Sequence, residues 1–274
     1  MKQKKASALT FCVTLVLAMI FAFPLYLILS NSFKTYGEIF SSPLGLPKAP
    51  TVQNYVNAWN QADFLHYFAN TLLSTSVGLL IVVIVSSLAA YKLARTKTKL
   101  SHFFFLYFTL SMLLPFEVIM LPLVKILKTL GMLNNLVALG TVQASMSAAF
   151  SIFLYHGFVK TIPLALEEAA RIDGAGELKT FTAVIFPLLK PITTTVVVLN
   201  TLTYWNSFLL PLLTLTKVEV KTLPLFSYSF LGQYSSNYDL QLPAIILSGL
   251  PLIIFYLFMQ KNIEKGIAAS SVKG

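Results

Sequence analysis

The stretch TIPLALEEAARIDGAGELKTFTAVIFPLLKP, residues 161–191, is the most charged segment of its length in a chain made mainly of long apolar runs. Pro163 suits the first turn of a helix, where its missing N–H leaves no hydrogen bond unmade. Glu167 and Glu168 lie near the same helix start, where the helix dipole favours negative charge. These residues together predict that a short polar helix begins near Pro163.

The second half of the stretch predicts a turn and a further helix. Gly174 can adopt the left-handed backbone conformation that commonly ends a helix. A second short helix is expected to begin at Glu177 and to end at Pro187, which lacks a backbone N–H. The small alanines between the charges allow the backbone of another protein to approach closely. We therefore interpret the stretch as a compact docking element held between two apolar segments.

The same residues resemble the EAA loop of ABC-importer permeases. The family pattern is Glu-Ala-Ala, three residues, Gly, nine residues, Ile, any residue and Leu-Pro. This chain fills the pattern with Glu168, Ala169, Ala170, Gly174, Val184, Phe186 and Pro187. Val184 and Phe186 are mild apolar departures from Ile and Leu. The residues from 168 to 175 look like the carbohydrate-uptake branch, the maltose-type permeases, and weaker similarity extends over nearly the whole chain.

The resemblance implies that residues 163–176 dock into a groove on an ATP-binding subunit. Glu168 would be the charged contact, and Gly174 would set the angle of the turn. The full set of residues expected to couple the chain to the ATPase is Glu168, Ala169, Ala170, Asp173, Gly174 and Pro187. The chain has no Walker motif, so ATP and Mg²⁺ would be bound by the partner subunits. We expect no catalytic residue, metal site or cofactor in this chain.

The composition indicates a membrane protein with several spans. Apolar residues make up 56% and charged residues 11% of 274, and the mean hydropathy is +0.76. The net charge of +10 could suggest a nucleic-acid partner, but the basic residues flank apolar runs and form no stripe on a polar face. A lipid bilayer is therefore the expected partner. Cys12 is the single cysteine, which excludes a disulfide within the chain.

Six apolar segments are predicted to cross the membrane, since about 20 apolar residues span the hydrocarbon core. They are residues 8–30, 70–93, 102–121, 136–158, 191–212 and 242–259. Residues 159–190 then form a cytoplasmic coupling loop, and residues 1–274 form a single transmembrane permease domain. The fold class expected is an all-α membrane protein, and the resemblance implies the type I ABC importer (MetI-like) architecture. The fifth span is expected to break at Pro211.

The distribution of basic residues predicts the orientation of these spans. Fourteen of the 20 Lys and Arg residues fall on the side that holds residues 159–190 and both termini, and six fall on the other side. Cytoplasmic loops carry the excess of Lys and Arg, so both termini and the coupling loop are expected in the cytoplasm. The expected location is the inner (cytoplasmic) membrane of a bacterial cell.

Polar residues inside the fourth and fifth spans predict a substrate path. Polar groups within a span are unfavourable unless they face a cavity or another helix. The helical repeat places the polar residues of the fifth span, which begin at Thr193, on one face, and two further residues lie one turn apart in the fourth span. Such a stripe suits an uncharged sugar, although the same residues could simply join helices by hydrogen bonds. The candidates are Gln143, Ser147, Asn200, Thr203, Tyr204 and Ser207.

Three classes of function compete for this pattern. A permease subunit of an oligosaccharide importer would need a second, different permease, two ATP-binding subunits and an extracytoplasmic sugar-binding protein. A self-sufficient secondary sugar carrier would usually need buried charges or an ion site at broken helices, and Glu117 is the single acidic residue within a predicted span. A membrane anchor would leave the polar stripe unexplained. The docking loop favours the importer, and maltodextrins, raffinose-type or fructose-containing oligosaccharides and glycerol phosphate all remain compatible substrates.

Overall fold

The computed structural model describes residues 8–61, 63–231 and 237–271, and its regular elements within those ranges are helices. Four helices there are long and apolar enough to cross a membrane: α1 (Ala8–Ser32), α4 (Phe64–Arg95), α7 (Leu136–Val159) and α14 (Tyr238–Ser271). Two bent helix pairs raise the number to six if each pair makes one span. The basic residues Lys2, Lys4, Lys5 and Lys273, used above for orientation, lie outside the described residues.

The chain divides into two compact units, and the first comprises residues 1–64 and 226–250. It contains α1, the short helices α2 (Tyr36–Ser41) and α3 (Gln53–Gln61), and the first part of α14. The segment after α1 folds around Lys34, whose side chain is fully buried. Its ammonium group donates to Asn31 Oδ1 at 2.9 Å and to the Ser42 carbonyl at 2.7 Å. Asn54 then donates to the Lys34 carbonyl at 2.7 Å, which ties α3 to this segment.

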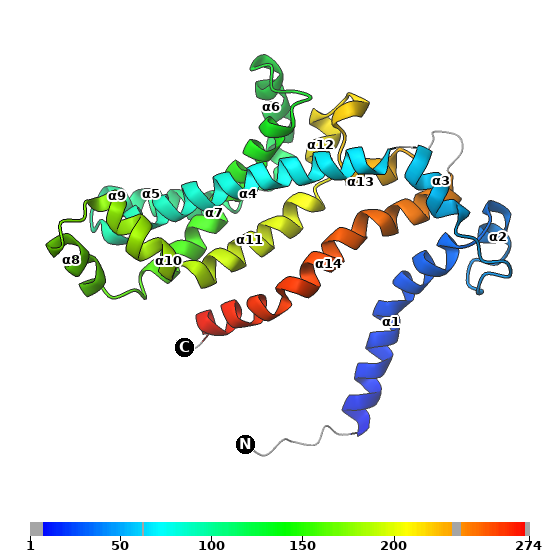
Figure 1. Cartoon of the computed structure of the whole chain (residues 1–274), viewed down its shortest axis with the longest axis horizontal. Helices are drawn as coiled ribbons and strands as arrows, with labels where there is room; N and C mark the ends of the chain where they lie inside the picture. Colours follow the sequence, from blue (N-terminus) through cyan, green and yellow to red (C-terminus); the bar gives the residue numbers. More distant parts are fainter. Residues whose placement is uncertain (1–7, 62, 232–236, 272–274) are drawn as a thin grey trace. The chain divides into compact units, whose positions relative to one another are not determined.

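The second unit comprises residues 65–225 and 251–274 and holds both candidate sites. Helix α7 packs against α5 (Lys99–Ser111) and against α11 (Lys190–Trp205). Figure 1 shows α8, α9 and α10, the short helices of the coupling loop, gathered at one end of α4, α7 and α11. The remaining elements are α6 (Phe116–Thr129), α8 (Ala165–Ile172), α9 (Glu177–Thr180), η1 (Phe181–Ile185), α10 (Phe186–Leu188), α12 (Leu209–Thr214), η2 (Val218–Val220) and α13 (Leu223–Tyr228).

Two glycines allow α4 and α7 to cross at close range. A Cβ atom added at Gly78 would lie 3.0 Å from the Gly140 carbonyl oxygen and 2.8 Å from Cε2 of Tyr204. A Cβ atom added at Gly140 would run into the backbone carbonyl of Ser74 on α4. Small residues at such crossings let helix backbones approach in membrane proteins. The crossing therefore depends on the absence of a side chain at both positions.

The third predicted span, residues 102–121, is not one straight helix. It is divided between α5 and α6, which meet at 103°. Pro115 is the N-cap of α6 with an extended ψ of 145°. A proline disfavours helical conformation in the residue before it and donates no hydrogen bond, so the chain leaves α5 before it reaches Pro115.

The predicted break at Pro211 is wrong in position. Helix α11 ends at Trp205, and Pro211 lies within the first turn of α12, where backbone N–H groups have no intrahelical acceptor. The helical path from Glu177 ends at Leu188, one residue after Pro187 and close to the predicted end. The turn before Pro187 widens to the π-helix η1, because proline cannot donate to the carbonyl four residues earlier. The path then bends by 75° before α11.

Candidate functional site

Helix α8 carries the EAA residues and ends in a tight glycine turn. Gly174 adopts the left-handed conformation predicted for it, with φ of +82°. Its N–H donates to the Arg171 carbonyl at 3.0 Å, and the N–H of Ala175 donates to the Ala170 carbonyl at 2.9 Å. This pair of bonds is the Schellman motif, which satisfies carbonyls at a helix end and reverses the chain direction. Asp173 is the C-cap residue of the same turn.

The half of the coupling loop that follows the turn is packed into the protein core. Phe181, Ile185 and Leu189 are buried, and the ring of Phe181 lies 5.3 Å from that of Tyr91 on α4. The cluster also takes in the ends of α4 and α7 and the start of α11. Its buried members are Ala90, Tyr91, Ile152, Tyr155, Val159, Ile162, Phe181, Ile185, Leu189, Ile192 and Val196. This half of the loop is therefore fixed to the helices that carry it.

Helix α8, by contrast, exposes an apolar face. Leu164, Leu166 and Ile172 are exposed, and Ile172 reaches 86%. Glu168 and Ala169 are exposed beside them. An exposed apolar patch beside a charge is typical of a surface that binds another protein.

The structure brings five of the six predicted coupling residues together on α8 and its turn. These five are Glu168, Ala169, Ala170, Asp173 and Gly174. Pro187 lies apart from them, in α10. Ala170 is half-buried and the other four are exposed.

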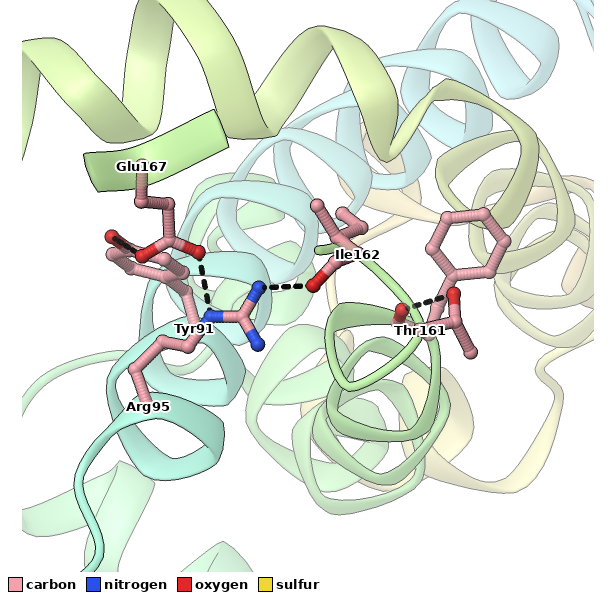
Figure 2. A network of polar contacts seen from close by, with 6 residues as sticks. Tyr91, Arg95, Thr161, Ile162 and Glu167 are labelled. Carbon is pink, nitrogen blue, oxygen red and sulfur yellow. Dashed lines mark hydrogen bonds and ion pairs between the residues drawn. The ribbon is translucent and has the colours of Figure 1, made fainter. Parts of the chain in front are cut away.

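Glu167 makes the most buried polar contact of the loop, and the sequence reasoning assigned it only to the helix dipole. Its side chain is 3% exposed, and its Oε1 accepts a bond from Arg95 Nε at 2.6 Å. Its Oε2 accepts a bond from the Tyr91 hydroxyl at 2.9 Å. Arg95 Nη2 also donates to the Ile162 carbonyl at 2.9 Å (Figure 2). Adjacent side chains point about 100° apart on a helix, which allows Glu167 and Glu168 to face different surroundings.

A second ion pair between α4 and the loop lies at the surface. Lys92 Nζ is 2.9 Å from Glu177 Oε2, and the two side chains are 64% and 70% exposed. The hydrogen bond and charge of Lys92 lower the pKa of the Glu177 carboxyl below its usual value. Exposed pairs of this kind contribute little to stability because water and salt screen them.

All six predicted substrate-path residues line one cavity of about 480 Å³, and they are Gln143, Ser147, Asn200, Thr203, Tyr204 and Ser207. Apolar side chains from α6, α7, α11 and α12 complete the wall, and they include Phe116, Phe150 and Phe208. Thr193, the first residue of the predicted stripe, lies outside the wall and accepts a hydrogen bond from Tyr155 at 3.1 Å.

Most polar groups of the cavity are already hydrogen-bonded within the protein. Asn200 donates to Ser151 Oγ at 3.2 Å and to the Val196 carbonyl, while the hydroxyls of Ser147 and Tyr204 contact each other. Gln143 Nε2 donates to the Tyr204 carbonyl at 3.4 Å. Gln143 Oε1, however, is buried and has no hydrogen-bond partner among the described residues. A buried acceptor without a partner is unfavourable, so a ligand donor that reached this oxygen would satisfy it.

The sequence profile of the family "Binding-protein-dependent transport system inner membrane component" matches residues 83–269, which include the coupling loop and the cavity residues from α6 to α12. The chain belongs to this family. The resemblance to ABC-importer permeases stated above is therefore confirmed, and the permease is a transport component rather than an enzyme.

Curated relatives match this permease over nearly its full length. It is 39% identical to the probable starch degradation products transport system permease protein AmyC of Thermoanaerobacterium thermosulfurigenes, with 94% of each chain covered. It is 35% identical to the melibiose/raffinose/stachyose import permease protein MelC of Bacillus subtilis, with 92% of this chain and 91% of the relative covered.

A solved structure shares the fold of the permease. One chain of a bacterial ABC transporter involved in the import of the acidic polysaccharide alginate superposes with a TM-score of 0.79. The alignment covers 95% of the permease and 99% of that chain at 24% sequence identity. The all-helical fold is thus the MetI-like fold of ABC importer permeases.

Proposed function

We propose that this permease forms half of the translocation path of an ATP-driven importer of uncharged oligosaccharides. The observation that carries the proposal is the cavity in the second unit, whose wall contains hydroxyl, amide and aromatic groups and no charged side chain among its lining residues. Pockets for small molecules are mainly apolar with a few placed polar groups that fix orientation. The printed names of the relatives, which include starch degradation products and raffinose, support the same class of substrate.

The free oxygen of Gln143 supports an uncharged substrate in particular. An amide oxygen accepts a hydrogen bond from a sugar hydroxyl and repels a phosphate or carboxylate oxygen. Recognition of an anion usually relies on an arginine or a lysine, and the lining residues of this cavity include neither. Oligosaccharides therefore suit the cavity better than glycerol phosphate does.

The exposed face of α8 is the surface through which the permease would receive energy from ATP. Leu164, Leu166 and Ile172 offer apolar contact area, and Glu168 offers an exposed negative charge on the same helix. Gly174 and Asp173 hold the turn that orients the helix. We assign the binding of this face, and of ATP with Mg²⁺, to a separate ATP-binding subunit.

The family supports a larger assembly for this chain, and we propose its composition. It consists of this chain as one permease domain, a second and different permease, two ATP-binding subunits and an extracytoplasmic sugar-binding protein. We retain six spans, with α5 and α6 together as the third and α11 with α12 as the fifth, so that residues 159–190 stay in the cytoplasm. The excess of Lys and Arg on one side supports cytoplasmic termini in a bacterial inner membrane.

A pull-down from mild detergent tests the coupling surface. The parent chain should recover an ATP-binding subunit, and Glu168→Lys should lose it because the exposed negative charge beside the patch is reversed. Lys179→Glu, which reverses an exposed charge on α9 outside the patch, is the matched control and should recover the subunit as the parent does. Equal recovery with Glu168→Lys would show that α8 is not the docking surface.

Uptake by proteoliposomes containing the whole assembly tests the substrate. Labelled raffinose should enter when ATP is present and the membrane potential and pH gradient are collapsed, whereas labelled glycerol phosphate should not. Uptake driven by an ion gradient without ATP would instead establish a secondary carrier. Uptake of glycerol phosphate alone would contradict the assignment of the cavity to sugars.

A further inference from the structure

The carboxylate of Glu167 is held on both of its oxygens by the last turns of α4. Arg95 donates to Oε1 at 2.6 Å and Tyr91 donates to Oε2 at 2.9 Å, and these two residues are one helical turn apart. Arg95 also holds the Ile162 carbonyl, at the junction between α7 and α8. Figure 2 shows the guanidinium of Arg95 between the Glu167 carboxylate and the Ile162 carbonyl. One end of α4 is thus bonded to α8 and to the residue that leads into it.

These bonds reach a helix that the chain path does not connect to the coupling loop. Along the backbone, the loop is joined to α7 at its start and to α11 at its end. Two further links to α4 are the ring contact of Tyr91 with Phe181 and the exposed pair of Lys92 with Glu177. Both involve the second half of the loop, whereas Glu167 is in α8 itself.

Glu167 and Glu168 connect α8 to two different surroundings, the protein interior and the outer surface. Glu168 faces outward with the exposed apolar side chains of α8, and Glu167 faces α4. Any displacement of α8 by a bound partner therefore acts directly on the Glu167 carboxylate. Charge-assisted hydrogen bonds are short and directional, so they hold register better than apolar contacts that can slide.

The presence of a buried ion pair between Arg95 and Glu167 also argues for a role beyond stabilising the fold. Removing two charges from water is unfavourable, and well-packed apolar residues at such places are often as stabilising. The arginine side chain is 14% exposed and that of the glutamate 3%, so water screens this contact far less than the Lys92 pair.

We propose that Glu167, Arg95 and Tyr91 form a transmission link that makes α4 move together with α8 when the ATP-binding subunits close. Glu167 and Arg95 are positioning residues in this scheme, since neither touches ATP nor the sugar. The inference rests on the proposed function, because a displacement of α8 requires an ATP-binding subunit docked on its exposed face. Its consequence is that the link governs how efficiently ATP hydrolysis drives transport.

The experiment compares three variants in the purified, reconstituted assembly with its permease partner, ATP-binding subunits and binding protein. Glu167→Gln keeps the shape and an acceptor for Arg95 but removes the charge. Tyr91→Phe keeps the ring that packs on Phe181 and removes the hydroxyl. Glu177→Gln is the control, because it removes an exposed carboxylate that pairs with the same end of α4. The readout is raffinose taken up per ATP hydrolysed, beside recovery of the ATP-binding subunits and the thermal unfolding midpoint.

We expect Glu167→Gln to lower uptake per ATP about tenfold, because the hydrogen bonds from Arg95 and Tyr91 would no longer be made to a charged carboxylate. Tyr91→Phe should lower it by a smaller factor, and Glu177→Gln should leave it unchanged. All three variants should retain the ATP-binding subunits. Parental transport per ATP in both Glu167→Gln and Tyr91→Phe would overturn the link.

Loss of the ATP-binding subunits or of the folded state in both linked variants would also overturn the inference, because the contacts would then serve assembly or folding alone. Failure of the proposed function is distinguishable, since the parent and the Glu177→Gln control would then recover no ATP-binding subunit either.

Discussion

Glu167 and Glu168 are neighbours with the same side chain, yet one is buried against α4 and the other faces solvent. The helical repeat separates adjacent side chains by about 100°, so the same chemistry serves two different surfaces. Gly174 and Gly176 are likewise the same residue type in two different settings, because their φ values are +82° and −70°. Neither glycine has an atom within 4 Å of an added Cβ, so backbone conformation alone distinguishes them.

Gly174→Val should therefore uncouple the permease while Gly176→Val does not. A β-branched residue at positive φ is strained by about 1–3 kcal/mol, which is enough to open the turn that orients α8. We expect the Gly174 variant to assemble but to transport less sugar per ATP, as measured in proteoliposomes. Equal transport by the two variants would mean that the conformation of the turn is irrelevant.

Gln143→Leu should weaken sugar uptake, since it removes the free acceptor in the cavity and keeps the volume of the side chain. We expect the KM for raffinose to rise about tenfold, the equivalent of one lost hydrogen bond. Thr141→Val is a control on the same helix, because the Thr141 hydroxyl bonds only to the Val137 carbonyl of its own helix. An unchanged KM in Gln143→Leu would exclude this oxygen from sugar binding.

At the scale of helices, the effect of a proline depends on its place within an element. Pro115 is the N-cap of α6 and follows a break, whereas Pro211 lies in the first turn of α12. Pro187 follows a turn that has widened to a π-helix. The residue type predicts that a backbone hydrogen bond is missing. It does not predict whether the surrounding chain bends, widens or starts a helix, because that depends on packing.

The same distinction explains how much of the two sites could be predicted. The polar stripe of α11 could be predicted because the helical period alone places Asn200, Thr203 and Tyr204 on one face, and all three line the cavity. Ser207 lines the cavity too, although it lies beyond the end of α11. The glycine turn was predicted from one residue's conformational freedom. The burial of Glu167 could not be, since it arises from α4, which lies 72 residues earlier along the chain. Local sequence patterns do not show which residues distant along the chain come into contact.

The crossing of α4 and α7 should be sensitive to a single methyl group. Alanine usually stabilises a helix relative to glycine by about 1 kcal/mol. At Gly140 the added Cβ would meet the Ser74 carbonyl, so Gly140→Ala should instead destabilise the permease by about 1–3 kcal/mol. Gly157→Ala on the same helix meets no atom within 4 Å and should be neutral or stabilising. Thermal unfolding in detergent measures both, and a stabilised Gly140 variant would contradict the crossing.

For the molecule as a whole, the charge asymmetry and the apolar helices argue for one orientation in the membrane. Fourteen of the 20 basic residues fall on the side assigned to the coupling loop. The described helices offer four spans, or six with the two bent pairs counted. An even number of spans places both termini on the same side.

Reporter fusions test this orientation. A fluorescent protein that folds only in the cytoplasm should be active at either terminus, and a periplasmic phosphatase fused after Lys125 should be active on the other side. Activity of the phosphatase at either terminus would contradict six spans with cytoplasmic ends.

The buried amine of Lys34 has a practical consequence for following the protein in solution. Amine-reactive labels need access to a free lysine side chain, and Lys34 is fully enclosed while Lys48 in the same segment is exposed. Mass spectrometry of the labelled, folded permease should therefore find modified Lys48 and unmodified Lys34. The rate at which Lys34 becomes labelled would then report how often this segment opens, without any substitution in the chain.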